Sequence, residues 1–151
     1  SNTFEILMDQ LDMPLEMRSS SAFLHAEIQE VVVHKSVGWE FRFAFAEVLP
    51  IALFKELRQR LKDEFSKTGN QATFTIQVAN QDFSADLLQA YYREVFEDGL
   101  ALAGFKGLYQ DLQVRAEGQE LIISGPSSVD TEHFRKNHLP NLAKQLEAFG
   151  F

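Results

Sequence analysis

A nine-residue stretch at positions 39–47 limits the possible folds of this chain more than any other segment. Aromatic side chains occupy every second position, at Trp39, Phe41, Phe43 and Phe45. Because strand side chains point alternately to opposite faces, this pattern predicts a β-strand with one continuous aromatic face. Burying each ring is worth roughly 1.5–3 kcal/mol. We therefore predict that this strand forms the centre of a sheet and that helices cover its rings.

The alternative use of such a stripe is a platform on which nucleic-acid bases stack. The other face of the same strand offers only Glu40, Arg42 and two alanines. If the rings faced solvent, the sheet would have almost nothing left to bury. The sequence therefore favours a core wall over a base-stacking platform.

Periodicity along the rest of the chain predicts the other elements. Apolar spacing of three and four residues indicates helices, alternation indicates strands, and Pro140 should kink or split the last helix. The apolar residues on either side of Gln29 and Glu30 do not keep the same alternation, which predicts a β-bulge there. Asp130 is a residue type that favours the N-cap of a helix. The expected helices are 3–13, 50–66, 84–102 and one that runs from the Asp130 cap to about 149; the expected strands lie within 23–35, 39–47, 72–79, 112–115 and 120–123.

This order predicts an α+β fold. We expect two layers: a largely antiparallel five-stranded sheet, built from two hairpins and one single strand, with helices on one face. A length of 151 residues suits one domain. The prediction is a single domain over 1–151, in which 1–20 form a helix and a loop and 21–151 form the α+β core.

Composition narrows the possible functions. The formal charge of −8 repels polyanions, so binding through phosphate contacts alone is disfavoured, although a local basic stripe can overcome the average. The lack of cysteine excludes disulfides and thiolate metal sites and fits a reducing compartment. There is no signal peptide and no apolar run long enough to cross a bilayer. We expect a cytoplasmic protein without membrane contact.

Motifs that carry catalysis are missing from the sequence. The four histidines have no metal-ligand spacing, and the paired acids at 63–64 and 97–98 have the pattern of solvated helix faces. No Walker loop, nucleophile elbow or dinucleotide fingerprint occurs. We therefore predict no catalytic, cofactor-binding or metal-binding residues here.

Two weaker features could contact a partner. Lys55, Arg58 and Lys62 share one side of the 50–66 helix, where they form either an ordinary solvated face or a contact surface for nucleic acid or an acidic partner. Arg135 and Lys136 are further basic candidates for such a contact.

The Gly-x-x-Gly sequence at 104–107 has the form of the loop that clamps nucleic-acid backbone in KH modules. A KH loop should join two helices, however, and this one is close to a predicted strand.

The chain as a whole resembles the N-terminal region of the PolC-type DNA polymerase III alpha subunit, the replicative polymerase of low-GC Gram-positive bacteria. The segments that carry the resemblance are FEILM at 4–8, IQEVVVHK at 28–35, WEFRF at 39–43, LP at 49–50, FRKNH at 134–138 and FGF at 149–151. They identify a region of the family and contain no catalytic signature.

The resemblance implies a parent nucleotidyltransferase that synthesises DNA on a template and proofreads with a 3′–5′ exonuclease. Its catalytic aspartates and magnesium would lie in later domains, and none of those motifs falls on a residue of this chain. The implied role is a non-catalytic interaction domain, without a cofactor, that contacts replisome proteins and the rest of the polymerase chain. The alternative is an auxiliary KH-like domain that binds single-stranded or primed DNA.

Overall fold

The computed structural model describes residues 2–36, 38–97, 112–125 and 127–151. Its contacts divide the chain into two compact units: unit 1 comprises 1–82 and 148–151, and unit 2 comprises 83–147. Unit 2 is thus an insertion, in sequence, between the two parts of unit 1. Compactness does not establish that either unit folds alone, so the single-domain prediction stays a prediction.

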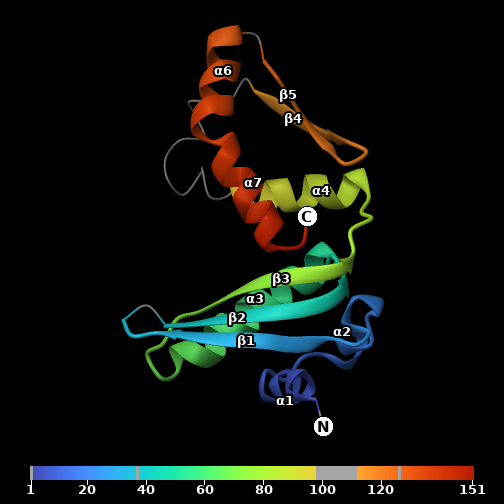
Figure 1. Ribbon diagram of the computed structural model, residues 1–151, viewed down its shortest axis with the longest axis vertical. Coiled ribbons are helices and arrows are strands. Elements are labelled where there is room, and N and C mark those ends of the chain that lie inside the picture. Colours follow the sequence, from blue (N-terminus) through green and yellow to red (C-terminus); the bar gives the residue numbers. More distant parts are fainter. Residues whose placement is uncertain (1, 37, 98–111, 126) are drawn as a thin grey trace. The chain divides into compact units, whose positions relative to one another are not determined.

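Unit 1 is a three-stranded sheet with helices (Figure 1). Polar caps and prolines set its helix boundaries: the Asn2 side chain accepts a hydrogen bond from the Phe4 amide, and Pro14 and Pro50 precede two of the helices. The short helix within 14–21 was predicted to be loop. In chain order the elements are α1 (Thr3–Gln10), α2 (Leu15–Arg18), the 3-10 turn η1 (Ser21–Phe23), β1 (Glu27–His34), β2 (Gly38–Glu47), α3 (Ile51–Ser66) and β3 (Ala72–Asn80).

The aromatic stripe forms the centre of this unit, as predicted. Phe41, Phe43 and Phe45 are buried, and Trp39 is half-buried. Neighbouring rings on β2 stack, with centroids 5.8 Å apart for Phe41 and Phe43 and 5.2 Å apart for Phe43 and Phe45. The wall is thus a packed core layer, and the base-stacking alternative is wrong for these rings.

Helices cover the ring face of the sheet. Phe4 of α1 lies 5.8 Å from Phe43 and 5.4 Å from Phe45, both edge-on. Phe65 of α3 packs against Phe41 at 5.5 Å, and Phe23 of η1 packs against Phe45 at 5.0 Å. Residues of β2 with the other parity point away from these helices, so unit 1 has two layers.

Sheet topology corrects one prediction. β1 pairs with β2 antiparallel, and the register shifts between Ile28 and Glu30, which confirms the predicted bulge. β3 pairs with β2 in parallel, from Trp39 opposite Ala72 to Glu47 opposite Asn80. A single five-stranded sheet is wrong: the described strands form one sheet of three and a separate hairpin. The 16-residue helix α3 carries the chain back to the starting end of β2, and that return makes the pair parallel.

Unit 2 contains the hairpin and the remaining helices. Its elements are α4 (Ala85–Tyr92), the π-helical turn η2 (Arg93–Glu97), β4 (Gln113–Glu117), β5 (Glu120–Ser124), α6 (Ser128–Asn137) and α7 (Leu139–Ala148). The β4–β5 hairpin packs on α4, where the Gln89 side chain donates a hydrogen bond to the Val114 carbonyl at 3.1 Å. Phe96 meets Phe134 edge-on at 5.2 Å and joins η2 to α6.

Two helix predictions are refined here. The prediction of Asp130 as N-cap is wrong, because α6 begins at Ser128 and position 130 lies inside the helix. The predicted break at Pro140 is confirmed, because α6 ends at Asn137 and α7 starts at Leu139. Proline is tolerated there because the first turn of a helix needs no amide donor. The predicted helix 84–102 is described only to residue 97, and the Gly-x-x-Gly sequence at 104–107 lies outside the described residues.

Candidate interaction surfaces

The predicted basic residues of α3 lie on one side of the helix, since their spacing of three and four residues places them on adjacent turns. Lys55 and Lys62 are exposed. Arg58 is half-buried, with its guanidinium carbon 5.0 Å from the centre of the Phe54 ring. That distance is within the range of a cation–π contact. The stripe therefore combines two exposed lysines with an arginine that also packs on the core.

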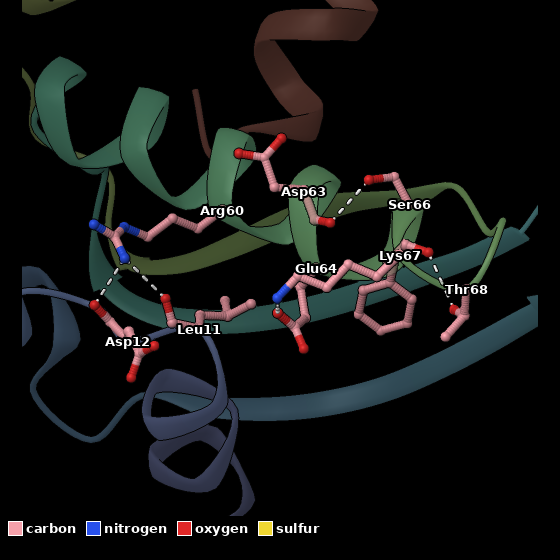
Figure 2. Close-up of polar contacts among 9 residues, drawn as sticks. Leu11, Asp12, Arg60, Asp63, Glu64, Ser66, Lys67 and Thr68 are labelled. Carbon is pink, nitrogen blue, oxygen red and sulfur yellow. Dashed lines mark hydrogen bonds and ion pairs between the residues drawn. The ribbon is translucent and has the colours of Figure 1, made fainter.

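Arg60, which sequence analysis left outside the stripe, has a structural role. Its Nη1 donates hydrogen bonds to the carbonyls of Leu11, at 3.0 Å, and Asp12, at 2.8 Å (Figure 2). Its Nε pairs with Glu56 on the preceding turn of α3. Asp12 has a positive φ of 50°, which turns the chain as it leaves α1. Arg60 thus ties the end of α1 to the middle of α3. Sequence spacing gives no sign of this contact, because its partners are backbone atoms 48 and 49 residues away.

Acidic residues dilute the positive charge near the end of α3. Asp63 accepts a hydrogen bond from Gln59 at 2.8 Å, and its carbonyl accepts one from the Ser66 hydroxyl. The Lys67 ammonium lies 2.9 Å from Glu64 (Figure 2). This hydrogen bond, helped by the attraction of the carboxylate charge, raises the pKa of Lys67. The end of α3 therefore carries one ion pair, Lys67 with Glu64, beside the Asp63 carboxylate.

The second basic group lies on α6 in unit 2. Nη2 of Arg135 contacts both carboxylate oxygens of Glu132, at 2.8 and 2.7 Å, and this hydrogen bonding raises the pKa of Arg135. Lys136 is exposed. The five predicted contact residues are thus divided between two units, and each group forms part of the surface of its own unit.

The face of the β1–β2–β3 sheet opposite the aromatic wall carries an ion-pair network. Arg42 of β2 bonds to Glu30 of β1 at 2.6 Å and lies 3.9 Å from Glu40. His34 lies 3.3 Å from Glu40, next to the β1–β2 turn. Glu30 and Arg42 face each other across the antiparallel pair, whereas His34 and Glu40 are offset by two residues in the register. This end of the face therefore carries charged side chains of both signs.

The other end of the same face is hollowed. A depression of about 450 Å³ has small side chains at its floor, among them Ala44, Ala46 and Ala79. Leu24, which is 62% exposed, and Glu27 also line it. The two alanines on this face are visible in the sequence. The depression itself is not, because residues of the η1–β1 connection also line it. An apolar floor next to a carboxylate suits a protein side chain better than a phosphate.

The described residues contain no cluster of side chains that could bind a metal ion. Within them, no three His, Cys, Asp or Glu side chains gather closely enough to hold an ion. The rings of His133 and His138 are 6.4 Å apart, and His138 packs on the Phe134 ring. Among the helices described, none has both the length and the apolar character needed to cross a bilayer.

Two family models match the chain. The first, DNA polymerase III polC-type N-terminus I, matches residues 3–76, and the second, DNA polymerase III polC-type N-terminus II, matches residues 90–151. Together they cover most of the sequence. No solved structure matches it.

Curated proteins named DNA polymerase III PolC-type are similar over the whole chain. The identity is 62% with the protein of Streptococcus sanguinis strain SK36, 61% with that of Streptococcus pneumoniae strain D39 and 56% with that of Streptococcus pyogenes strain Manfredo. Each alignment covers 100% of this chain and 10% of the relative. The chain thus spans about a tenth of the length of these relatives.

Proposed function

Because this chain belongs to the PolC-type DNA polymerase III family, as its N-terminal region, we propose that it is a non-catalytic interaction domain of a replicative polymerase. The observation that carries the proposal is that both matching models describe the N-terminus of the family and that the chain spans only a tenth of its relatives. DNA synthesis with 3′–5′ proofreading, and the magnesium it needs, would belong to other domains of a cytoplasmic parent chain.

The open face of the β1–β2–β3 sheet is the surface we assign to this role. Its hollow combines an exposed apolar side chain, Leu24, with small alanines that let a partner approach the backbone closely. Partners of this chemistry are other replisome proteins or later parts of the polymerase chain. The acidic balance of the protein supports protein contacts over extended phosphate contacts.

A binding assay with purified replisome proteins tests the proposal. A full-length PolC-type polymerase that carries this region should bind at least one of them more tightly than the same polymerase without it. Ala44→Glu places a charge in the hollow and should weaken that binding, whereas Val129→Glu, at a position that is 75% exposed in unit 2, should not. Equal binding with and without the region would refute the interaction role.

A second candidate function, auxiliary binding of single-stranded or primed DNA, rests on the exposed lysines of α3. Their shared face would contact phosphates, so binding should fall steeply with salt. Changing Lys55, Arg58 and Lys62 together to Glu should abolish it, with Arg135→Glu and Lys136→Glu as the corresponding test on α6. Undetectable binding of the wild-type chain to single-stranded DNA at low salt would exclude this function.

Absence of catalysis is tested separately. We expect residues 1–151, incubated with primed DNA, deoxynucleotides and magnesium, to neither extend nor degrade the primer. Activity of a pure sample would contradict the non-catalytic assignment.

A further inference from the structure

The last four residues of the chain complete the core of unit 1. Residues 148–151 belong to unit 1 although the whole of unit 2 separates them from β3 in sequence. α7 ends at Ala148, and Phe149 and Gly150 follow as a turn. Phe149 and Gly150 thus belong to unit 1, where Phe149 packs its ring on two others and Gly150 lies close to valine side chains.

Phe149 inserts its ring between helix and sheet. The ring lies edge-on to Phe54 of α3, with centroids 4.6 Å apart, and 5.8 Å from Phe74 of β3. Phe54 and Phe74 are themselves buried. Edge-to-face pairs at these distances are favourable beyond the apolar area that they bury. The gap between α3 and β3 therefore accepts an aromatic ring.

Gly150 is required at the next position for two reasons. Its φ of 104° lies in the region that L-amino acids rarely adopt. A Cβ atom would stand 2.8 Å from Cγ1 of Val78 and 3.6 Å from Cγ2 of Val48, closer to the first than side chains tolerate. A side chain at this position would therefore strain the backbone and force Val78 to move.

We propose that this groove, formed by Phe54, Phe74, Val48 and Val78, is a docking site for a Phe-Gly segment and that the chain's own Phe149-Gly150 occupies it as a latch. In the structure the Phe149 ring already lies against Phe54 and Phe74. The proposal is independent of any replisome partner and so goes beyond the proposed function.

The latch contradicts a division of the chain into two self-sufficient regions. The first family model ends at residue 76, whereas Phe149 lies in the second. If the latch closes unit 1, the first region lacks part of its own core when the second is removed. The chain leaves unit 1 after β3 and returns to it after α7.

Hydrogen exchange on the full 151-residue chain tests the proposal. Phe149→Ala removes the ring, and Gly150→Val forces the segment out of the groove. Each should speed amide exchange in β3 and in the facing part of α3 by roughly tenfold or more, because local opening becomes easier. Lys144→Ala, at an exposed position of α7, is the matched control and should leave exchange in unit 1 unchanged.

Rescue in trans separates a specific site from general packing. A peptide of residues 144–151, added to the Gly150→Val chain at millimolar concentration, should restore protection of β3, and the same peptide with Phe149→Ala should not. If Gly150→Val does not fold, Phe149→Leu, which keeps an apolar side chain, replaces it and should respond to the peptide in the same way. Unchanged exchange in β3 for the variants, or equal rescue by both peptides, would overturn the latch.

Discussion

Replacing Arg60 by alanine should release the end of α1 from α3. The side chain makes two hydrogen bonds to backbone carbonyls, of Leu11 and Asp12, and one ion pair with Glu56. The side chains of Leu11 and Met13 are buried, so the contact holds a core segment in place. The loss should therefore appear as lower stability of the whole unit and as faster exchange of the amides that follow α1.

The expected cost follows from these contacts. A hydrogen bond to a charged group is worth about 1.5–3 kcal/mol when buried, but the Arg60 side chain is 33% exposed, so we take about 0.5–1 kcal/mol for each. The i,i+4 pair with Glu56 adds about 0.3–0.5 kcal/mol. Arg60→Ala should thus cost about 1–2.5 kcal/mol, a large part of the roughly 5–15 kcal/mol that stabilises a domain.

Urea denaturation measures this cost, and two further variants make it specific. Arg60→Lys keeps the charge but loses the planar fork that reaches two carbonyls at once, so it should lose about half as much stability. Lys67→Ala removes an ion pair that is open to solvent and should cost much less stability than Arg60→Ala. If Arg60→Ala is as mild as Lys67→Ala, the tether is a surface contact and the reasoning fails.

Three further predictions concern unit 1. Phe43→Ala empties the middle of the aromatic wall and should cost about 3–5 kcal/mol in urea denaturation; a loss below 1 kcal/mol would mean that the wall is not the core. Gly38→Ala should cost about 1–3 kcal/mol and weaken the bond from the Trp39 amide to the Gln71 carbonyl, because its Cβ would lie 2.2 Å from that oxygen at a φ of 123°. The pKa of Lys67 is raised by its hydrogen bond to Glu64, so the ion pair stabilises the folded protein fully below pH 10.5, the ordinary pKa of lysine. This stabilisation is lost as the pH rises through the higher pKa of the folded protein. Equal alkaline denaturation profiles for wild type and Lys67→Met would contradict this.

Features that depend on local periodicity were predictable from the sequence. The alternating rings from Trp39 to Phe45, the bulge between Ile28 and Glu30 and the break near Pro140 each follow from the side chains of one short segment. Parity fixes which face a strand buries, and proline lacks the amide that a helix interior requires. These properties do not depend on which segments pair in space.

Strand pairing was predicted less well, because alternation says which face is buried but not which strand lies alongside. The pattern of Phe74, Ile76 and Val78 suits a parallel or an antiparallel neighbour equally. A helix of 16 residues between β2 and β3 is the feature that favours a parallel return. The hairpin at β4 and β5 was assigned to the same sheet because the order of elements suits one five-stranded sheet, but it forms a separate sheet.

The candidate site was predicted in part for similar reasons. Charge spacing placed Lys55, Arg58 and Lys62 on one helix face, and the structure agrees, but their contact role stays a prediction. The hollow beside Ala44 is lined by the η1–β1 connection and by three strands, so no single segment of the sequence predicts it. The last helix was expected to run to about 149; the contact of Phe149 with Phe54 depends on the return of the chain to unit 1 after α7.

The parallel pair of β2 and β3 gives a physical reason to expect a partner on the open face. Strands in parallel pairs are generally covered on both faces and are apolar throughout. Here only the ring face is apolar, and the other presents Thr73, Thr75 and Gln77 on β3 beside Arg42 and Ala44 on β2. Such a face is polar enough to stay in solution, yet its alanines leave the backbone of the hollow close to the surface. A binding partner would therefore add the layer that parallel strands usually have, without the free protein exposing a large apolar patch.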